Sequence, residues 1–119
     1  MKKNNKKFRV ISLFSGAGGM DLGFINAGFD IVWANDFFKE AVESYKKNIS
    51  EDIVFGDITK IKSSEMPDDI DLVIGGFPCQ GFSVANTKRS MKDERNFLYK
   101  EMLRVIKDKN PKFFVAENV

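Results

Sequence analysis

Short apolar runs that end in turn residues alternate along this chain with segments of helical periodicity, and this alternation limits the fold more than any other feature. Strands separated by helices need crossover connections, so they pair in parallel and carry helices on the faces of the sheet. The pattern predicts strands at residues 9–14, 30–35, 52–55, 71–75 and 112–116, and helices at 20–27, 38–49 and 97–107. We therefore predict an α/β protein with an open, doubly wound, mostly parallel sheet.

The size and composition of the chain suit one globular domain. With 119 residues the chain can bury a single core. Its 12 phenylalanines are spread along the sequence, which is more typical of core packing than of a binding surface. No apolar run reaches the length of a membrane span, and no signal-peptide pattern opens the chain. We therefore expect a cytoplasmic protein without membrane contacts.

Cysteine, histidine and charge narrow the function classes. One cysteine cannot form an internal disulfide. The lack of histidine excludes His-based triads and His metal sites, and a lone cysteine cannot make a thiolate zinc site, so no metal site is expected. A net charge of +2 is too weak to indicate nucleic-acid binding. We expect residues 1–8 to form a basic, solvated tail rather than an arm that binds phosphate.

A glycine-rich turn over residues 15–19 joins the first predicted strand to the first predicted helix. Glycine allows a tight turn and lets a ligand approach the amides at the helix N-terminus. The dinucleotide-binding pattern needs glycine or alanine at position 21, where this chain has Asp21. An acid there would repel phosphate and could attract an ammonium group. By itself, the turn is as typical of a structural loop as of a ligand site.

Acidic residues end the second and third predicted strands. Asp36 follows Gly16 by 20 residues, a spacing at which a carboxylate can accept ribose hydroxyls, and Asp57 ends the third strand. Ligands of open α/β sheets bind beyond the carboxyl ends of the strands, so both acids point to one crevice. Phe14 and Phe37 could hold an adenine ring between them. The alternative is that the two acids only cap the helices that follow. Together they favour a nucleoside ligand.

A second candidate site follows the fourth predicted strand. Cys79 lies between Pro78 and glycines at the expected ligand edge, where a positive environment favours a thiolate; the alternative is a small core residue. Glu117 ends the fifth strand on the same edge, and its alternative is a solvated strand terminus. Residues 80–95 form a long polar connection, which is typical of a functional or a disordered loop, and we favour function.

Four blocks of the sequence resemble, in order, the signature motifs of the DNA cytosine-5 methyltransferases. The blocks are Phe14-Ser15-Gly16-Ala17-Gly18-Gly19, Gly56-Asp57-Ile58, Gly76-Phe77-Pro78-Cys79-Gln80-Gly81-Phe82-Ser83 and Glu117-Asn118-Val119. The Pro-Cys-Gln block and the closing Glu-Asn-Val are the blocks most specific to this family, whereas a glycine-rich turn alone is not specific. The resemblance extends from Arg9 onward and implies the Rossmann-like fold of methyltransferases that use S-adenosylmethionine (SAM).

The resemblance implies a role for each matching residue. Asp57 would bond the adenine amino group, with Phe37 and Ile58 packing on the ring. Cys79 would attack cytosine C6, and Glu117 would hold and protonate N3 of a base flipped out of double-stranded DNA. The implied SAM-binding positions are Phe14, Ser15, Gly16, Ala17, Gly18, Gly19, Asp36, Phe37, Asp57, Ile58 and Pro78, and the implied DNA contacts are Gln80, Ser83 and Asn118.

The chain also departs from the family pattern. Asp36 stands where the family more often has glutamate, so its reach to the ribose is shorter by a methylene. The family's later arginine-bearing block, target-recognition domain, last strands and final SAM-pocket helix do not occur in these residues. We therefore expect residues 9–119 to be the N-terminal part of the catalytic domain, truncated after the fifth strand.

Such a fragment or split subunit has consequences for activity and partners. We expect it to be inactive alone, to need a C-terminal half or a complementing subunit, and to self-associate through its exposed sheet edge. Two alternatives remain open, namely a SAM- or nucleoside-binding module without catalysis and an RNA cytosine-5 methyltransferase of the same fold.

Overall fold

The computed structural model describes residues 7–77 and 97–118 and contains a five-stranded, fully parallel sheet. The strands are β1 (Arg9–Leu13), β2 (Asp30–Asp36), β3 (Ile53–Phe55), β4 (Leu72–Phe77) and β5 (Phe113–Asn118), and the helices are α1 (Gly19–Asn26), α2 (Lys39–Asn48), η1 (Ile58–Lys60), η2 (Ser63–Glu65) and α3 (Phe97–Lys109). The order β3-β2-β1-β4-β5 confirms the predicted doubly wound sheet.

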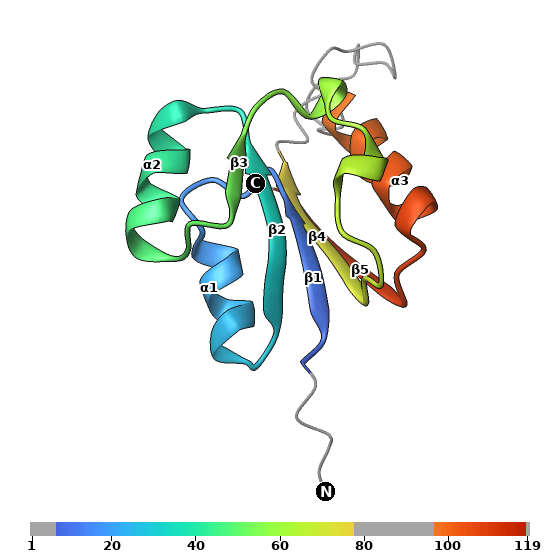
Figure 1. Ribbon diagram of the computed structural model, residues 1–119, viewed down its shortest axis with the longest axis horizontal. Coiled ribbons are helices and arrows are strands. Elements are labelled where there is room, and N and C mark those ends of the chain that lie inside the picture. The colour runs from blue at the N-terminus through green and yellow to red at the C-terminus, as the bar shows by residue number, and fades with distance from the viewer. Residues whose placement is uncertain (1–6, 78–96, 119) are drawn as a thin grey trace, which may run out of the picture.

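Helices cover both faces of the sheet. Figure 1 shows α1 and α2 on one side, with α3 and the two short 3₁₀ helices η1 and η2 on the other. The strand order reverses between β1 and β4, because the chain crosses from the β3 edge back to the middle of the sheet. Open α/β sheets bind ligands at such a reversal, beyond the carboxyl ends of the strands. The topology therefore marks the ends of β1 and β4 as the expected site.

Two apolar cores result from the alternation of side chains along the strands. On the α1–α2 face the buried residues are Val10, Ile31, Ala34, Val42, Tyr45, Ile53, Leu72 and Ile74. On the α3 face they are Ile11, Leu13, Trp33, Ile58, Met66, Ile70, Val73, Met102 and Val105. Neighbouring residues of β1 thus face opposite cores, which explains why this central strand is apolar on both sides.

The 3₁₀ helices after β3 were not predicted from the sequence. Arg104 of α3 donates hydrogen bonds of 2.9 Å to Ser63 Oγ and 3.0 Å to the Ile58 carbonyl oxygen. Its guanidinium also contacts Glu101, with Nη2 2.6 Å from Oε1. A single arginine on α3 therefore holds both turns of the connection against the helix, a long-range contact that local sequence does not reveal.

The phenylalanines whose side chains the structure describes lie outside the fully buried core, contrary to the expectation from their spread along the chain, although Phe14, Phe24 and Phe29 pack against it. Among the side chains that the structure describes, no phenylalanine is buried, and the exposed ones are Phe8, Phe37, Phe38, Phe55, Phe113 and Phe114. Branched aliphatic side chains fill the central strands instead, because both faces of these strands are covered. These exposed phenylalanines lie at strand ends and on the edge strands of the sheet.

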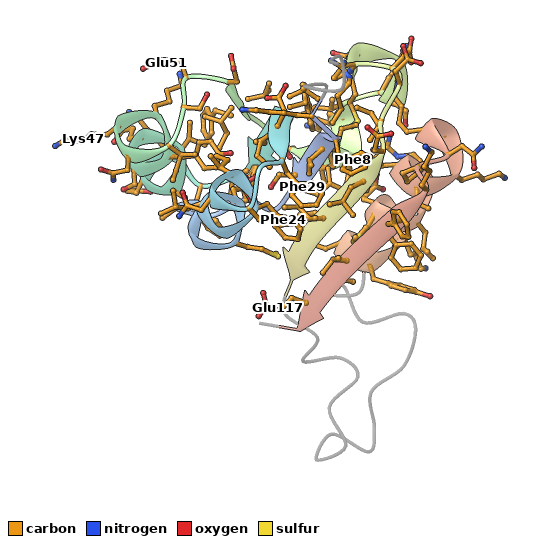
Figure 2. All side chains as sticks on the ribbon, turned by 90° about the horizontal axis from the view of Figure 1, so that it is seen from below. Phe8, Phe24, Phe29, Lys47, Glu51 and Glu117 are labelled. Carbon is orange, nitrogen blue, oxygen red and sulfur yellow. The ribbon has the colours of Figure 1, made fainter. Side chains whose placement is uncertain are left out.

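In the described part of the chain, β5 is an edge strand that pairs only with β4. Phe113, Phe114 and Val115 are exposed on it. An apolar groove of about 310 Å³ lies beside this edge, and three of its lining residues, Phe8, Phe24 and Phe29, group together in Figure 2. Phe8 was expected in the tail, but its ring centroid lies 5.9 Å from that of Phe29.

Candidate functional site

A cavity of about 640 Å³ opens at the carboxyl ends of the strands, within the size range of ligand pockets. Eight residues singled out from the sequence line it, namely Phe14, Ser15, Gly16, Asp36, Phe37, Asp57, Ile58 and Glu117. The strand ends bring them together, since these residues follow or close β1, β2, β3 and β5. The predicted crevice therefore exists where the sheet topology places it.

The turn after β1 divides its glycines between two tasks. Gly16 has φ +60°, and a Cβ built on it would meet nothing within 4 Å, so it lies open at the cavity. Gly18 has φ +97°, and a Cβ there would lie 2.7 Å from Ile49 Cγ1 and 2.9 Å from Tyr45 Cδ2. Gly18 thus serves packing against α2, and the cavity lining includes neither it, Ala17 nor Gly19.

Asp36 joins the glycine turn to the end of β2. Its Oδ2 accepts a 2.7 Å hydrogen bond from the Gly16 amide, and its Oδ1 accepts a 2.9 Å bond from the Phe38 amide. The side chain is 8% exposed, and the residue lines the cavity. Each carboxylate oxygen has further acceptor capacity, so Asp36 can support the turn and still accept a bond from a ligand.

Asp57 is both a helix cap and a cavity residue. Its Oδ1 accepts hydrogen bonds from the Thr59 hydroxyl at 2.7 Å and the Thr59 amide at 3.0 Å, which start the 3₁₀ turn containing Ile58. The Thr59 hydroxyl, followed by the Thr59 amide, holds the pKa of this carboxyl below its usual value. The carboxylate is therefore ionised at neutral pH, with Oδ2 available as an acceptor. The capping alternative and the ligand-site prediction are both compatible with this geometry.

Aromatic rings line the mouth of the cavity. Phe37 is 62% exposed and Phe38 is 68% exposed, with their ring centroids 6.1 Å apart in an edge-to-face arrangement. Phe14 lines the same cavity and has φ 54°, a left-handed conformation that is costly for a bulky residue. Strained residues of this kind are concentrated at ligand sites. Exposed, flat apolar rings suit the stacking of a planar base.

Asp21 does not line the cavity, so it cannot contact a ligand's ammonium group directly. Its side chain is 1% exposed and accepts hydrogen bonds from Ser12 Oγ at 2.7 Å and from Tyr45 Oη at 2.6 Å. Burial raises the pKa of this carboxyl, although the bonds from Tyr45 and Ser12 act in the opposite direction. Position 21 lies within the first turn of α1, where helical geometry directs the side chain toward the sheet and α2.

Glu117 lies beside the end of β4. The sheet register pairs Glu117 with Gly76 and Asn118 with Phe77, and Glu117 appears at the end of β5 in Figure 2. Glu117 and Gly76 both line the cavity. In sequence, Phe77, the last residue of β4, immediately precedes the Pro-Cys-Gln block. The predicted residues Pro78, Cys79, Gln80 and Ser83 lie outside the described residues.

Sequence reasoning missed several lining residues, namely Met20, Asn35, Phe38, Gly56, Gly76 and Leu98. Most of them adjoin a predicted residue in sequence, so their neighbours were the available signal. Asn35 has a supporting role, since its Nδ2 donates bonds of 2.9 and 3.0 Å to the carbonyl oxygens of Val54 and Gly56. Leu98 comes from α3, and only the tertiary fold brings it to the strand ends.

The charge of the cavity lining distinguishes between ligand classes. Three acids, Asp36, Asp57 and Glu117, line the cavity, and no lysine or arginine lies among its described lining residues. Such a lining disfavours a pyrophosphate and suits a neutral or cationic nucleoside with hydrogen-bond donors. In residues 7–77 and 97–118, no three His, Cys, Asp or Glu side chains form a group that could hold a metal ion. In the same described ranges, no helix is long and apolar enough to cross a membrane.

Comparison with known proteins gives one consistent family. The sequence profile of the C-5 cytosine-specific DNA methylases matches residues 8–119. The type II methyltransferase M.NgoFVII of Neisseria gonorrhoeae is 49% identical over 121 residues, which cover 100% of this chain and 32% of that protein. M.FnuDI of Fusobacterium nucleatum is 49% identical over 111 residues, covering 93% of this chain and 32% of that protein.

Solved structures agree with the sequence matches. A DNA modification methyltransferase encoded within an E. coli prophage has a TM-score of 0.78 and 36% identity, covering 95% of this chain and 32% of that chain. The S. pombe Dnmt2 methyltransferase has a TM-score of 0.72 and 30% identity, and the match covers 95% of this chain and 36% of that chain. The chain thus spans about a third of the length of these relatives. Since the matches run along nearly all of it, this chain belongs to the family of C-5 cytosine-specific DNA methylases.

Proposed function

We propose that this chain supplies the cofactor cavity and two catalytic residues of an enzyme that methylates C5 of cytosine in double-stranded DNA, with SAM as methyl donor. The observation that carries the proposal is the convergence of Phe14, Asp36, Asp57 and Glu117 on one cavity at the strand ends. The chain covers about a third of its relatives' length, so the remaining two-thirds of such an enzyme would come from further residues or a complementing subunit.

The cavity lining fits SAM. Asp57 is suited to accept a bond from the adenine amino group, and Asp36 from the ribose hydroxyls. Phe37 and Ile58 would pack against the ring. The acidic lining also matches a positively charged sulfonium, and SAM when bound supplies the methyl group. Pro78, which follows β4 in sequence, completes the proposed cofactor residues.

Two residues would act on the cytosine. The Cys79 thiolate forms a bond to C6, and the displaced ring electrons make C5 nucleophilic. Glu117 holds N3 and gives it a proton, which neutralises the charge that develops on the ring. After methylation, loss of the C5 proton is coupled to release of the Cys79 sulfur from C6, which restores the aromatic ring. Because these atoms are inaccessible in a duplex, the base must be flipped out, with Gln80, Ser83 and Asn118 as proposed DNA contacts.

Binding of the cofactor can be measured on this chain directly. We expect S-adenosylhomocysteine, the stable product of methyl transfer, to bind in calorimetry with a stoichiometry of one. Adenosine alone should compete, because the proposed contacts of Asp36 and Asp57 are to the nucleoside. A chain whose purified, folded form binds neither compound would contradict the assignment of the cavity.

Catalysis can be measured in a chimera in which residues 1–119 replace the corresponding third of M.NgoFVII. DNA containing 5-fluorocytosine should trap a covalent adduct, because fluorine at C5 cannot leave as a proton does. Cys79→Ser should abolish the adduct while SAM still binds. An adduct that persists in this variant would mean that another residue attacks the ring.

One further substrate, RNA containing 5-fluorocytosine, separates the alternative functions. If the chimera traps 5-fluorocytosine RNA but not DNA, the chain belongs to an RNA-modifying enzyme. If the chimera binds SAM and DNA but traps neither substrate, the chain is a binding module without catalysis. Unmodified M.NgoFVII is the matched positive control for every arm.

A further inference from the structure

A continuous chain of buried hydrogen bonds runs beneath the glycine turn. Ser15 Oγ lies 2.8 Å from Ser12 Oγ, which donates a 2.7 Å bond to Asp21 Oδ1, and Tyr45 Oη donates a 2.6 Å bond to Asp21 Oδ2. Ser12 and Asp21 are 1% exposed and Tyr45 is fully buried. At one end of this series of hydrogen bonds, Ser15 lines the cavity, and at the other end, Tyr45 lies in α2.

The available protons give this chain of bonds a direction. Both Asp21 carboxyl oxygens accept hydrogen bonds, from Ser12 Oγ and from Tyr45 Oη, so Ser12 uses its single hydroxyl proton for Asp21. The 2.8 Å contact between Ser12 Oγ and Ser15 Oγ then requires Ser15 to be the donor. Ser15 also points its hydroxyl proton toward Ser12 in its 3.2 Å bond to the Ser12 carbonyl oxygen. Ser15 therefore offers the cavity only acceptor lone pairs.

The backbone of the turn is fixed by the same neighbours. The Ser15 amide donates a 3.0 Å bond to the Asn35 carbonyl, and the Gly18 amide donates a 3.1 Å bond to the Ser15 carbonyl. Gly18 also lies close against the Tyr45 ring, since a Cβ there would come within 2.9 Å of Tyr45 Cδ2. Tyr45 thus contacts the turn through its ring and reaches Asp21 through its hydroxyl.

We propose that Asp21 is a positioning residue that acts through Ser12 to hold the Ser15 hydroxyl as an acceptor-only group, so that the cavity selects a ligand with a cationic N–H donor at this point. The proposal rests on the proposed SAM site. There, Asp57 and Asp36 are assigned to the adenine amino group and the ribose hydroxyls. The donor that remains on the ligand is its α-ammonium group, which a hydroxyl with free lone pairs can accept.

A pair of ligands tests this selection: S-adenosylhomocysteine and its analogue in which hydrogen replaces the α-ammonium group. We expect the chain to prefer the parent compound by about tenfold or more, the scale of a hydrogen bond to a charged group. Ser15→Ala should remove most of this preference. Asp21→Asn should reduce it as well, although Asp21 does not line the cavity, and should add little in the Ser15→Ala background. Asp30→Asn, an exposed acid at the start of β2, is the matched control.

The preference between the two ligands, rather than affinity alone, separates positioning from folding. If Asp21 has a purely structural role, Asp21→Asn should weaken the binding of both ligands equally, and that result would overturn the proposal. Unchanged preference in Ser15→Ala would overturn it too. If Asp21→Asn does not fold, Ser12→Ala cuts the same chain of bonds and leaves the carboxylate in place.

A measurement without ligand keeps this inference distinct from the proposed function. In proton NMR, the Tyr45 hydroxyl should give a slowly exchanging, downfield resonance that disappears in Tyr45→Phe and shifts upfield in Asp21→Asn. Asp21→Asn should also move the Ser15 and Gly16 amide resonances, whereas Asp30→Asn should not. If the chain binds neither ligand but shows this coupling, the proposed function and the ligand selection fail, while the positioning of Ser15 by Asp21 stands. If the coupling is missing, the positioning role fails whatever the chain binds.

Discussion

The Gly16 amide donates a 2.7 Å hydrogen bond to Asp36 Oδ2, although the two residues are 20 positions apart in sequence. This bond ties the turn after β1 to the end of β2, and both residues line the cavity. Asp36 is therefore part of the wall that shapes the site as well as a candidate ligand contact. In the part of the chain that the structure describes, the Asp57 carboxylate, in contrast, accepts hydrogen bonds only from Thr59 of its own 3₁₀ turn.

Substituting these two acids should have different effects. Asp36→Ala leaves the amides of Gly16 and Phe38 without their partner, so we expect it to lower the free energy of unfolding by about 1–3 kcal/mol and also to weaken SAM binding. Asp57→Ala should weaken SAM binding by about tenfold or more and should cost less stability than Asp36→Ala, because it removes only the cap of a short 3₁₀ turn. Urea unfolding and calorimetry measure the two quantities. Unchanged affinity in both variants would remove the pocket assignment.

Gly18→Ala should destabilise the chain strongly. The substitution combines a left-handed backbone at φ +97° with a Cβ 2.7 Å from Ile49 Cγ1, which together should cost about 2–4 kcal/mol. Gly19→Ala is the matched control, because a Cβ there meets nothing within 4 Å and its φ is ordinary. Urea unfolding gives both values. Equal stability of the two variants would show that α2 does not pack against the turn.

The Asp57 carboxyl should titrate below its usual pKa of 3.8, since the Thr59 hydroxyl and then the Thr59 amide bond its charged form. Thr59→Val keeps the amide and should raise this pKa part of the way back. Because the folded pKa is depressed, the associated stability is present above the unfolded pKa and is lost as pH falls through the folded pKa. Carboxyl-detected NMR titration measures the shift, and an unaltered pKa in Thr59→Val would exclude the hydroxyl as its main cause.

The β5 edge should make the chain self-associate. Phe113, Phe114 and Val115 are exposed there, and the described chain supplies no strand beyond β5. Lysines discourage edge pairing, so Phe114→Lys should shift sedimentation toward monomer, whereas Phe55→Lys on the opposite edge strand β3 should change it less. A monodisperse monomer at high concentration, with slow amide exchange over residues 112–116, would contradict this expectation.

The sequence by itself determined the order of the helices and strands, and it determined that the site lies at the carboxyl ends of the strands. Apolar runs and helical periods are local patterns, because side chains alternate along a strand and repeat about every 3.6 residues along a helix. All five predicted strands and the three longer helices therefore occur within a few residues of their expected bounds. Once the strands are parallel, their carboxyl ends must share one edge, so Asp36, Asp57 and Glu117 converge.

Only the tertiary structure decided which side chains meet across elements. Asp21 looked like a ligand residue beside a glycine turn, but Tyr45 from α2 and Ser12 from β1 enclose it. Gly18 is required by the Tyr45 ring rather than by a ligand. None of the described phenylalanine side chains is fully buried, because other residues, mostly aliphatic, already fill both faces of the central strands. Such outcomes depend on distance in space between residues far apart in sequence, and no local pattern encodes that distance.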